Sequence, residues 1–138
     1  MSDLKDSLGR FYEEVANRGN LDVFDELLHD DYVEHEDLPG LPATKAGTRT
    51  LFQMLRSAFP DLHMAVEGMV EEGDTVAARV RMSGTHEGEF MDMPATGKRF
   101  DIQVMDFLQF SGGQVIAHWG VMDAAGMMEQ LGVAPGPA

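Results

Sequence analysis

The chain has 138 residues, of which 43% are hydrophobic and none is cysteine, so it can form one domain with a buried core but neither a disulfide framework nor a thiol nucleophile. Its formal net charge of −14, from 24 acidic and 10 basic residues, disfavours binding to nucleic acid and to anionic membranes. The sequence has no apparent signal peptide and no apolar run near the roughly 20 residues that span a bilayer. We expect one cytoplasmic domain with its core over residues 4–132 and a flexible tail over 133–138.

Apolar side chains recur at helical spacing along the first part of the chain. Residues 2–19 and 20–33 each carry such a stripe, and we expect a helix in each. Residues 34–44 contain prolines and a glycine and are expected to form a loop. A third helix is expected over residues 45–59, because Pro60 cannot continue it.

The second half has the pattern of strands. Residues 62–90 contain two strand-like runs joined at EEGD, and residues 97–123 contain a second pair joined at SGG. A short helix is expected over residues 124–131 and should end at Gly132. Helices followed by antiparallel strands indicate an α+β fold. A curved sheet wrapped around helices can leave a cavity, which would place ligand chemistry on the inward face of the sheet.

Asp123 lies in HWGVMDAAGMMEQLG, residues 118–132, between the last expected strand and the last helix. Asp is a favoured N-cap, and both capping and the helix dipole would lower its pKa. A general base that removes a proton from carbon needs an apolar pocket that raises the pKa. Gly126 stands where Glu or Gln would complete a capping box, and apolar residues precede the aspartate. The residues alone are consistent with either role.

Two other charged positions lie on expected strands. Asp106 interrupts the apolar face of FDIQVMDFLQF, which is costly unless the carboxylate is paired, functional or moved outward by a bulge. Arg81 lies on the polar face of TVAARVRMSGTH. It either makes ion pairs in solvent or reaches a pocket, where its guanidinium could hold a carboxylate or polarise a carbonyl.

The histidines do not have the spacing of a familiar metal site, and the EHED stretch around His35 is interpreted as a polar loop. We therefore expect no metal. His118 is either a hydrogen-bonded, half-buried histidine or a residue that orients a substrate or shuttles a proton. The 11 methionines suit core packing, and some of them could line a pocket for a flat apolar molecule.

Several motifs together resemble those of the SnoaL-like polyketide cyclase family, also called ester cyclases, within the nuclear-transport-factor-2-like superfamily. They are AFPDL, EEGDTVAARVRMSGTHEGEF, MPATGKRFDIQVMDFLQFSGGQVIAHWGVMD and MMEQLG. The resemblance implies a cone-shaped α+β fold, in which a curved antiparallel sheet wraps around N-terminal helices and encloses a pocket. It also implies a homodimer or homotetramer built through sheet faces, a hydrophobic or aromatic small-molecule ligand, and no metal or organic cofactor.

The resemblance further implies an acid/base reaction. An aspartate, here Asp123, would take a proton from an activated carbon, and the enolate would close a ring by intramolecular aldol attack. His118 belongs to the same motif and would assist it. The residues expected to bind substrate are Trp119, His35, His86, Arg81, Met105 and Met122.

Other functions fit the same residues. The chain could be an isomerase, or an epoxide hydrolase that uses Asp123, Arg81 and Asp106 around a water molecule. It could also be a binding module without catalysis, or a scaffold whose pocket its own methionines and aromatic residues fill. Fold alone does not choose among these functions.

Overall fold

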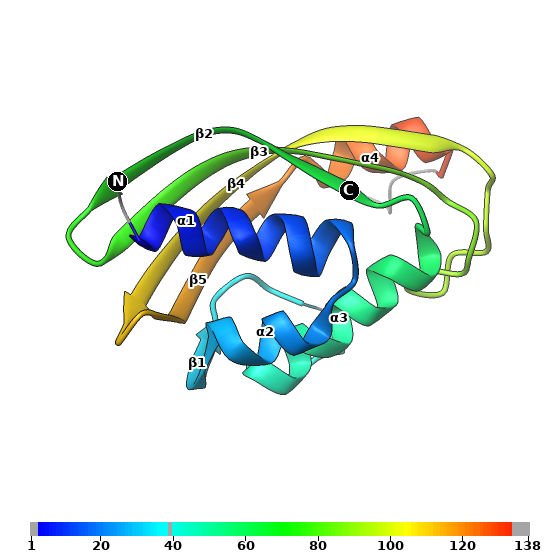
Figure 1. Ribbon diagram of the computed structural model, residues 1–138. Coiled ribbons are helices and arrows are strands. Elements are labelled where there is room, and N and C mark those ends of the chain that lie inside the picture. The colour runs from blue at the N-terminus through cyan, green and yellow to red at the C-terminus, as the bar shows by residue number, and fades with distance from the viewer. Residues whose placement is uncertain (1–2, 39, 134–138) are drawn as a thin grey trace.

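The computed structural model describes residues 3–38 and 40–133, and it has a layer of helices against one curved sheet (Figure 1). The helices are α1 (Asp3–Arg10), the π-helix η1 (Phe11–Asn17), α2 (Leu21–Leu27), α3 (Lys45–Ala58) and α4 (Ala124–Leu131). The strands are β1 (Leu28–Glu34), β2 (His63–Glu72), β3 (Thr75–Thr85), β4 (Arg99–Ser111) and β5 (Gln114–Met122). The expected α+β class is confirmed.

The sheet has the strand order β1-β5-β4-β3-β2. Strands β2 to β5 pair antiparallel, whereas β1 pairs parallel with β5, so the sheet is mixed rather than purely antiparallel. The expected helix over residues 20–33 is wrong after Leu27, because the chain turns extended at Leu28 and continues as β1. Pairing with β5 stabilises β1, and this tertiary contact overrides the helical spacing of the sequence.

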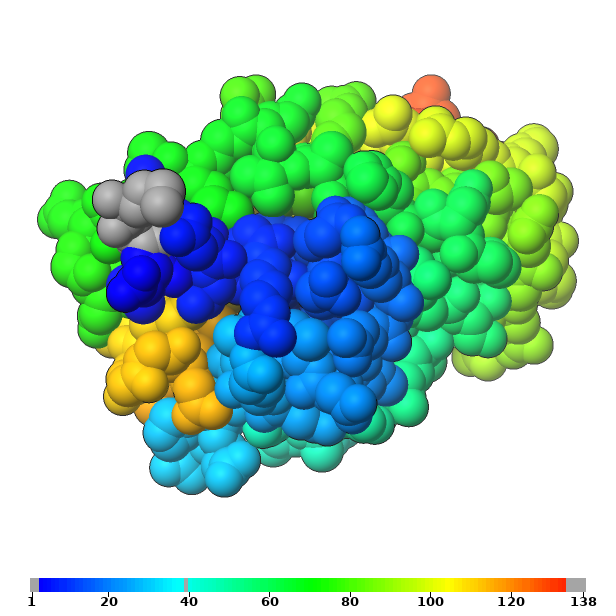
Figure 2. Space-filling view, in the orientation of Figure 1, coloured from blue at the N-terminus to red at the C-terminus, as the bar shows by residue number. Residues whose placement is uncertain are grey.

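The core lies between the helices and the inward face of the sheet. Along β3 the side chains of Val76, Ala78, Val80 and Met82 are buried and alternate with more exposed ones, as a half-covered sheet requires. The aromatic rings of Phe11, Phe24 and Phe52 pack against one another on the helical side. Figure 2 shows the N-terminal helices, in blue, filling the middle of this face with β2, in green, beside them.

The expected turns and the last helix are confirmed. The two hairpins turn at Gly73 and at Gly112–Gly113, where positive φ angles favour glycine. Helix α4 ends at Gly132 in the left-handed conformation. Most of the expected flexible tail, residues 134–138, lies outside the described residues. Within the described part, no helix is long and apolar enough to cross a membrane.

Candidate active site

Five side chains form one hydrogen-bonded chain between the helices and the sheet. The imidazole of His118 lies between two carboxylates, with Nδ1 at 2.6 Å from Oε2 of Glu34 and Nε2 at 2.7 Å from Oδ1 of Asp106. The Tyr32 hydroxyl donates to Oε1 of Glu34 over 2.9 Å, and the Tyr12 hydroxyl donates to Oδ2 of Asp106 over 2.6 Å. Each carboxylate therefore receives one histidine nitrogen and one tyrosine hydroxyl. We call these five residues the tyrosine–carboxylate–histidine chain.

Strand register brings the three charged groups together. Glu34 is the direct partner of His118 in the parallel β1–β5 pair, so their side chains lie beside each other on the inward face. Asp106 on β4 faces Gly120 on β5, two residues beyond His118, and the imidazole reaches it diagonally. A Cβ on Gly120 would lie 2.8 Å from Nε2 of His118 and 2.9 Å from Oδ1 of Asp106. The absent side chain of Gly120 leaves the space in which the pair forms.

The tyrosine hydroxyls complete the chain from the helical side and from β1. Tyr12 lies in η1 and Tyr32 in β1, and both side chains are buried. Burial, followed by the neighbouring carboxylate, raises the pKa of each phenol well above its usual range. Both tyrosines therefore stay protonated and donate their hydrogen to a carboxylate.

The two carboxylates hold His118 in its charged form. Burial by itself would lower the pKa of His118, but the hydrogen bonds to Asp106 and Glu34 outweigh it and raise the pKa to about 10. At neutral pH the imidazole is an imidazolium, so both ring nitrogens donate. The side chains of Glu34, Asp106 and His118 are 3%, 12% and 14% exposed, so the three charges interact with little screening by solvent.

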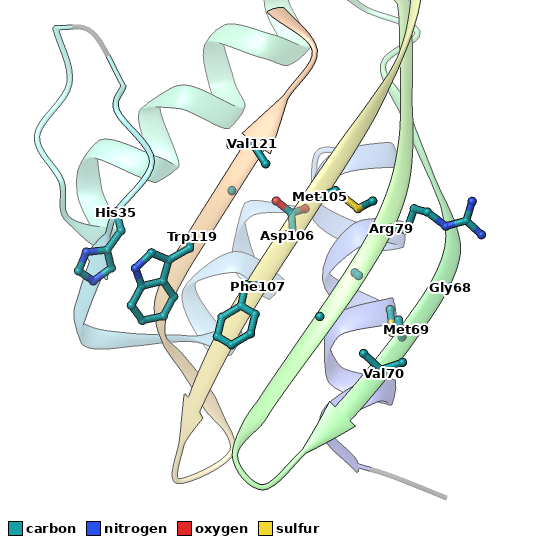
Figure 3. Close-up of a pocket in the computed structure, with 13 residues that line it drawn as sticks. His35, Gly68, Met69, Val70, Arg79, Met105, Asp106, Phe107, Trp119 and Val121 are labelled. Carbon is teal, nitrogen blue, oxygen red and sulfur yellow. The ribbon is translucent and has the colours of Figure 1, made fainter.

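A hollow of about 700 Å³ opens on the other face of the sheet, which the helices do not cover (Figure 3). Its walls are mostly apolar, from Val70 on β2, Met105 and Phe107 on β4, and Trp119 and Val121 on β5. Among the described residues, Asp106 is the member of the tyrosine–carboxylate–histidine chain that also lines this hollow. Met105 and Phe107 flank Asp106 on β4 and line the hollow, so the Asp106 carboxylate points to the opposite face of the sheet, where it belongs to the buried charge network.

One wall of the hollow is flat and aromatic. The rings of His35 and Trp119 stack with centroids 4.4 Å apart and planes 2° apart. Phe107 meets Trp119 edge-on at 5.8 Å. Trp119 and Phe107 are 40% and 48% exposed, so they present ring surface rather than filling the core. Such a wall suits a flat, apolar molecule.

The structure places the expected site residues in two groups. His118 and Asp106 lie in the buried chain, and His35, Met105 and Trp119 line the hollow. The other four expected residues, Met122, Arg81, His86 and Asp123, belong to neither group. Met122 at the end of β5 and Arg81 on β3 are exposed and do not line this hollow, and Arg81 forms an ion pair with Asp101.

His86 is fully buried, and it too lies outside the hollow. Its ring packs against Phe59, and Nδ1 accepts a hydrogen bond from the backbone N–H of Thr96. Its own backbone N–H also donates to the carbonyl of Lys98. His86, just after β3, therefore holds the residues just before β4 in place.

Asp123 is the N-cap of α4. Its carboxylate accepts the backbone N–H of Gly126 over 2.9 Å, and the residue is exposed. Of the two roles open to Asp123, the structure shows the cap, and Asp123 is not among the residues that line the hollow. Gly126 does not supply the partner of a capping box, but its missing side chain is what lets the carboxylate close on the helix, since a Cβ there would overlap it. The three groups that an epoxide hydrolase would use have other partners: Asp123 caps α4, Arg81 pairs with Asp101, and Asp106 pairs with His118.

The sequence interpretation missed Glu34, Tyr12 and Tyr32. Glu34 begins the EHED stretch, which was expected to be a polar loop, and its burial follows from the β1–β5 pairing. Glu36, two residues later, donates its backbone N–H to Oε2 of Glu34, and burial raises the pKa of its own carboxyl. Within the described ranges, no group of three or more histidine and acidic residues is placed to hold a metal ion.

Comparisons with known proteins identify the family of the chain. The model of the SnoaL-like polyketide cyclase family matches residues 7–131. Nogalonic acid methyl ester cyclase of Streptomyces nogalater is 29% identical over 84% of this chain and 88% of its own. Aklanonic acid methyl ester cyclase AcmA of Streptomyces galilaeus is 30% identical over 86% and 84%. The structure of TsrD from Streptomyces laurentii superposes with a TM-score of 0.87 and 28% identity over 96% of both chains.

Proposed function

The chain belongs to the SnoaL-like polyketide cyclase family, and we propose that it closes a ring in a polyketide ester by an intramolecular aldol reaction. Two relatives are named as cyclases of nogalonic and aklanonic acid methyl esters, and we take polycyclic esters of this kind as the substrate class. The flat wall formed by His35 and Trp119 suits the ring system of such a molecule.

The observation that carries the proposal is the pair of Asp106 and His118. Asp106 is a nearly buried carboxylate on a strand that lines the apolar hollow, and its partner His118 carries a positive charge. A carboxylate can accept a proton from a carbon next to a carbonyl, and a nearby cation stabilises the enolate that forms. We assign the base to Asp106 rather than Asp123, because the carboxylate of Asp123 caps α4.

The reaction then balances within the substrate. Asp106 takes the proton from the activated carbon, and the electron pair of that C–H bond forms the enolate. The enolate carbon attacks a ketone carbon of the same molecule, a C–C bond forms, and the carbonyl π electrons move to the oxygen. That alkoxide takes the proton back from Asp106. Substrate and product are isomers, so the step consumes no oxidant or reductant, and we propose that no cofactor takes part.

The test is turnover of nogalonic and aklanonic acid methyl esters by the wild-type protein and by Asp106→Asn. Positioned acid–base groups contribute about 10²–10⁴ in rate, so the variant should lose turnover by that factor while ligand binding changes far less. Asp123→Asn is the matched control and should retain turnover. A normal rate in Asp106→Asn would refute the assignment. Binding of the esters by wild-type protein without any turnover would instead indicate a binding protein.

A further inference from the structure

We propose that Glu34 is a positioning residue that fixes the charge and the ring orientation of His118 from the side away from the hollow. This inference rests on the proposed function only for its effect on the rate. Its structural basis is the contact of 2.6 Å between Oε2 of Glu34 and Nδ1 of His118, which the pairing of β1 with β5 brings about. It gives a role to a buried carboxylate that does not line the hollow.

Glu34 is placed to hold a hydrogen-bond donor and poorly placed to accept a proton from a substrate. Its Oε1 atom accepts the Tyr32 hydroxyl, and its Oε2 atom accepts both Nδ1 of His118 and the backbone N–H of Glu36. Its side chain is 3% exposed, against 12% for Asp106. The two carboxylates that flank the imidazole are therefore unequal: one is enclosed by donors, and the other borders the hollow.

The charges around His118 show why a second carboxylate matters. Glu34 on β1 and Asp106 on β4 contact the ring, and Tyr32 on β1 and Tyr12 on η1 bind these two carboxylates. The carboxyl of Glu36 also interacts electrostatically with His118. Asp106 alone would leave Nδ1 of a buried imidazolium without an acceptor, and that unmet donor is costly in a buried site. Glu34 satisfies it and also prevents the ring from rotating away from Asp106.

The experiment follows the ring nitrogens of His118 by ¹⁵N NMR during a pH titration of the full chain. In the wild-type protein both nitrogens should stay protonated well above pH 7. Glu34→Gln keeps the size of the side chain but removes its charge, and it should lower the His118 pKa by about one unit or more, a tenfold loss of proton affinity. Asp31→Asn removes a charge from the exposed side of the same strand and should leave the titration unchanged.

Each outcome decides the inference. An unchanged His118 titration in Glu34→Gln, or an equal shift in Asp31→Asn, would overturn it. If Glu34→Gln does not fold, the wild-type titration alone is used, and a His118 pKa near its ordinary value would overturn it. With an ester substrate, the fall of kcat at alkaline pH should occur at lower pH in Glu34→Gln than in the wild-type protein, in step with the His118 pKa, while KM changes little. If His118 shifts as expected but wild-type protein turns over no ester, the inference on Glu34 stands and the proposed function fails.

Discussion

Gly120 lies directly opposite Asp106 in the β4–β5 pair, and a side chain at Gly120 would occupy the space in which Asp106 meets His118. Gly120→Ala should therefore separate the two groups without removing either. We expect turnover to fall by about 10²-fold, as for loss of a positioned acid–base group, and the free energy of unfolding to fall by about 1–3 kcal/mol from overpacking. Steady-state kinetics and urea unfolding measure the two effects.

A glycine placed elsewhere in the same protein provides the control for this substitution. Gly9→Ala in α1 adds the same methyl group where no atom beyond the adjacent residues and the helix's own backbone lies within 4 Å, so it should leave turnover unchanged. If Gly120→Ala turned over ester at the wild-type rate, the Asp106–His118 contact would not be needed for catalysis.

The N-cap of α4 gives a separate prediction about stability. Asp123→Ala removes the acceptor of the Gly126 N–H, and such losses cost about 0.5–2 kcal/mol. Asp123→Asn retains a good capping residue and should be close to wild type. Urea unfolding of the two variants measures the difference. A large loss of turnover in Asp123→Ala, with the fold intact, would return Asp123 to the candidate catalytic residues.

The charge on His118 makes stability depend on pH. Its pKa is raised in the folded protein to about 10 from the ordinary histidine value of about 6.5, so the folded state binds the proton more tightly. The stabilisation is complete below about pH 6.5 and is lost as the pH rises towards about 10. The free energy of unfolding of the wild-type protein should decline over that window, and His118→Gln should decline less steeply. Parallel curves for the two proteins would contradict the raised pKa.

The apolar face that carries the hollow predicts an assembly. Strands β2, β4 and β5 carry five exposed large hydrophobic residues around the hollow: Val70, Met105, Phe107, Trp119 and Val121. We expect a second copy of the chain to pack on the rim of the hollow and enclose it, through an interface of about 1,600 Å² in total. Light scattering should give at least a dimer mass at micromolar concentration, and Phe107→Lys should reduce it to the monomer mass. Asp22→Lys on α2 adds a lysine on the helical side and should leave the mass unchanged.

Removal of metal ions tests the cofactor-free reaction. Because the aldol step is an isomerisation, turnover should survive exhaustive dialysis against a chelator. Loss of turnover on chelation, with recovery on addition of zinc or iron, would contradict the proposal. The assay needs the ester substrate and purified wild-type protein.

The sequence predicted most of the fold because its signals are local. The hairpin turns, Pro60 and Gly132 define element ends through backbone conformations that neighbouring residues determine. It failed at β1, where Leu28 to Glu34 follow a helix directly and become a strand only by pairing with β5, which lies about 80 residues further along the chain. The site depended on the same pairing. His118 and Asp106 were visible as polar residues on strands, but Glu34 acquires its partner only through tertiary register. Only geometry could assign Asp123 to the cap of α4 rather than to catalysis.

The stacking of His35 on Trp119 makes the intrinsic tryptophan fluorescence of the protein a reporter of the hollow. Trp119 is the single tryptophan of the chain, so all indole emission reports on the wall of the hollow. A flat molecule that enters the hollow would separate or cover the two rings and change the emission. Ligands can therefore be screened by fluorescence before any turnover is known.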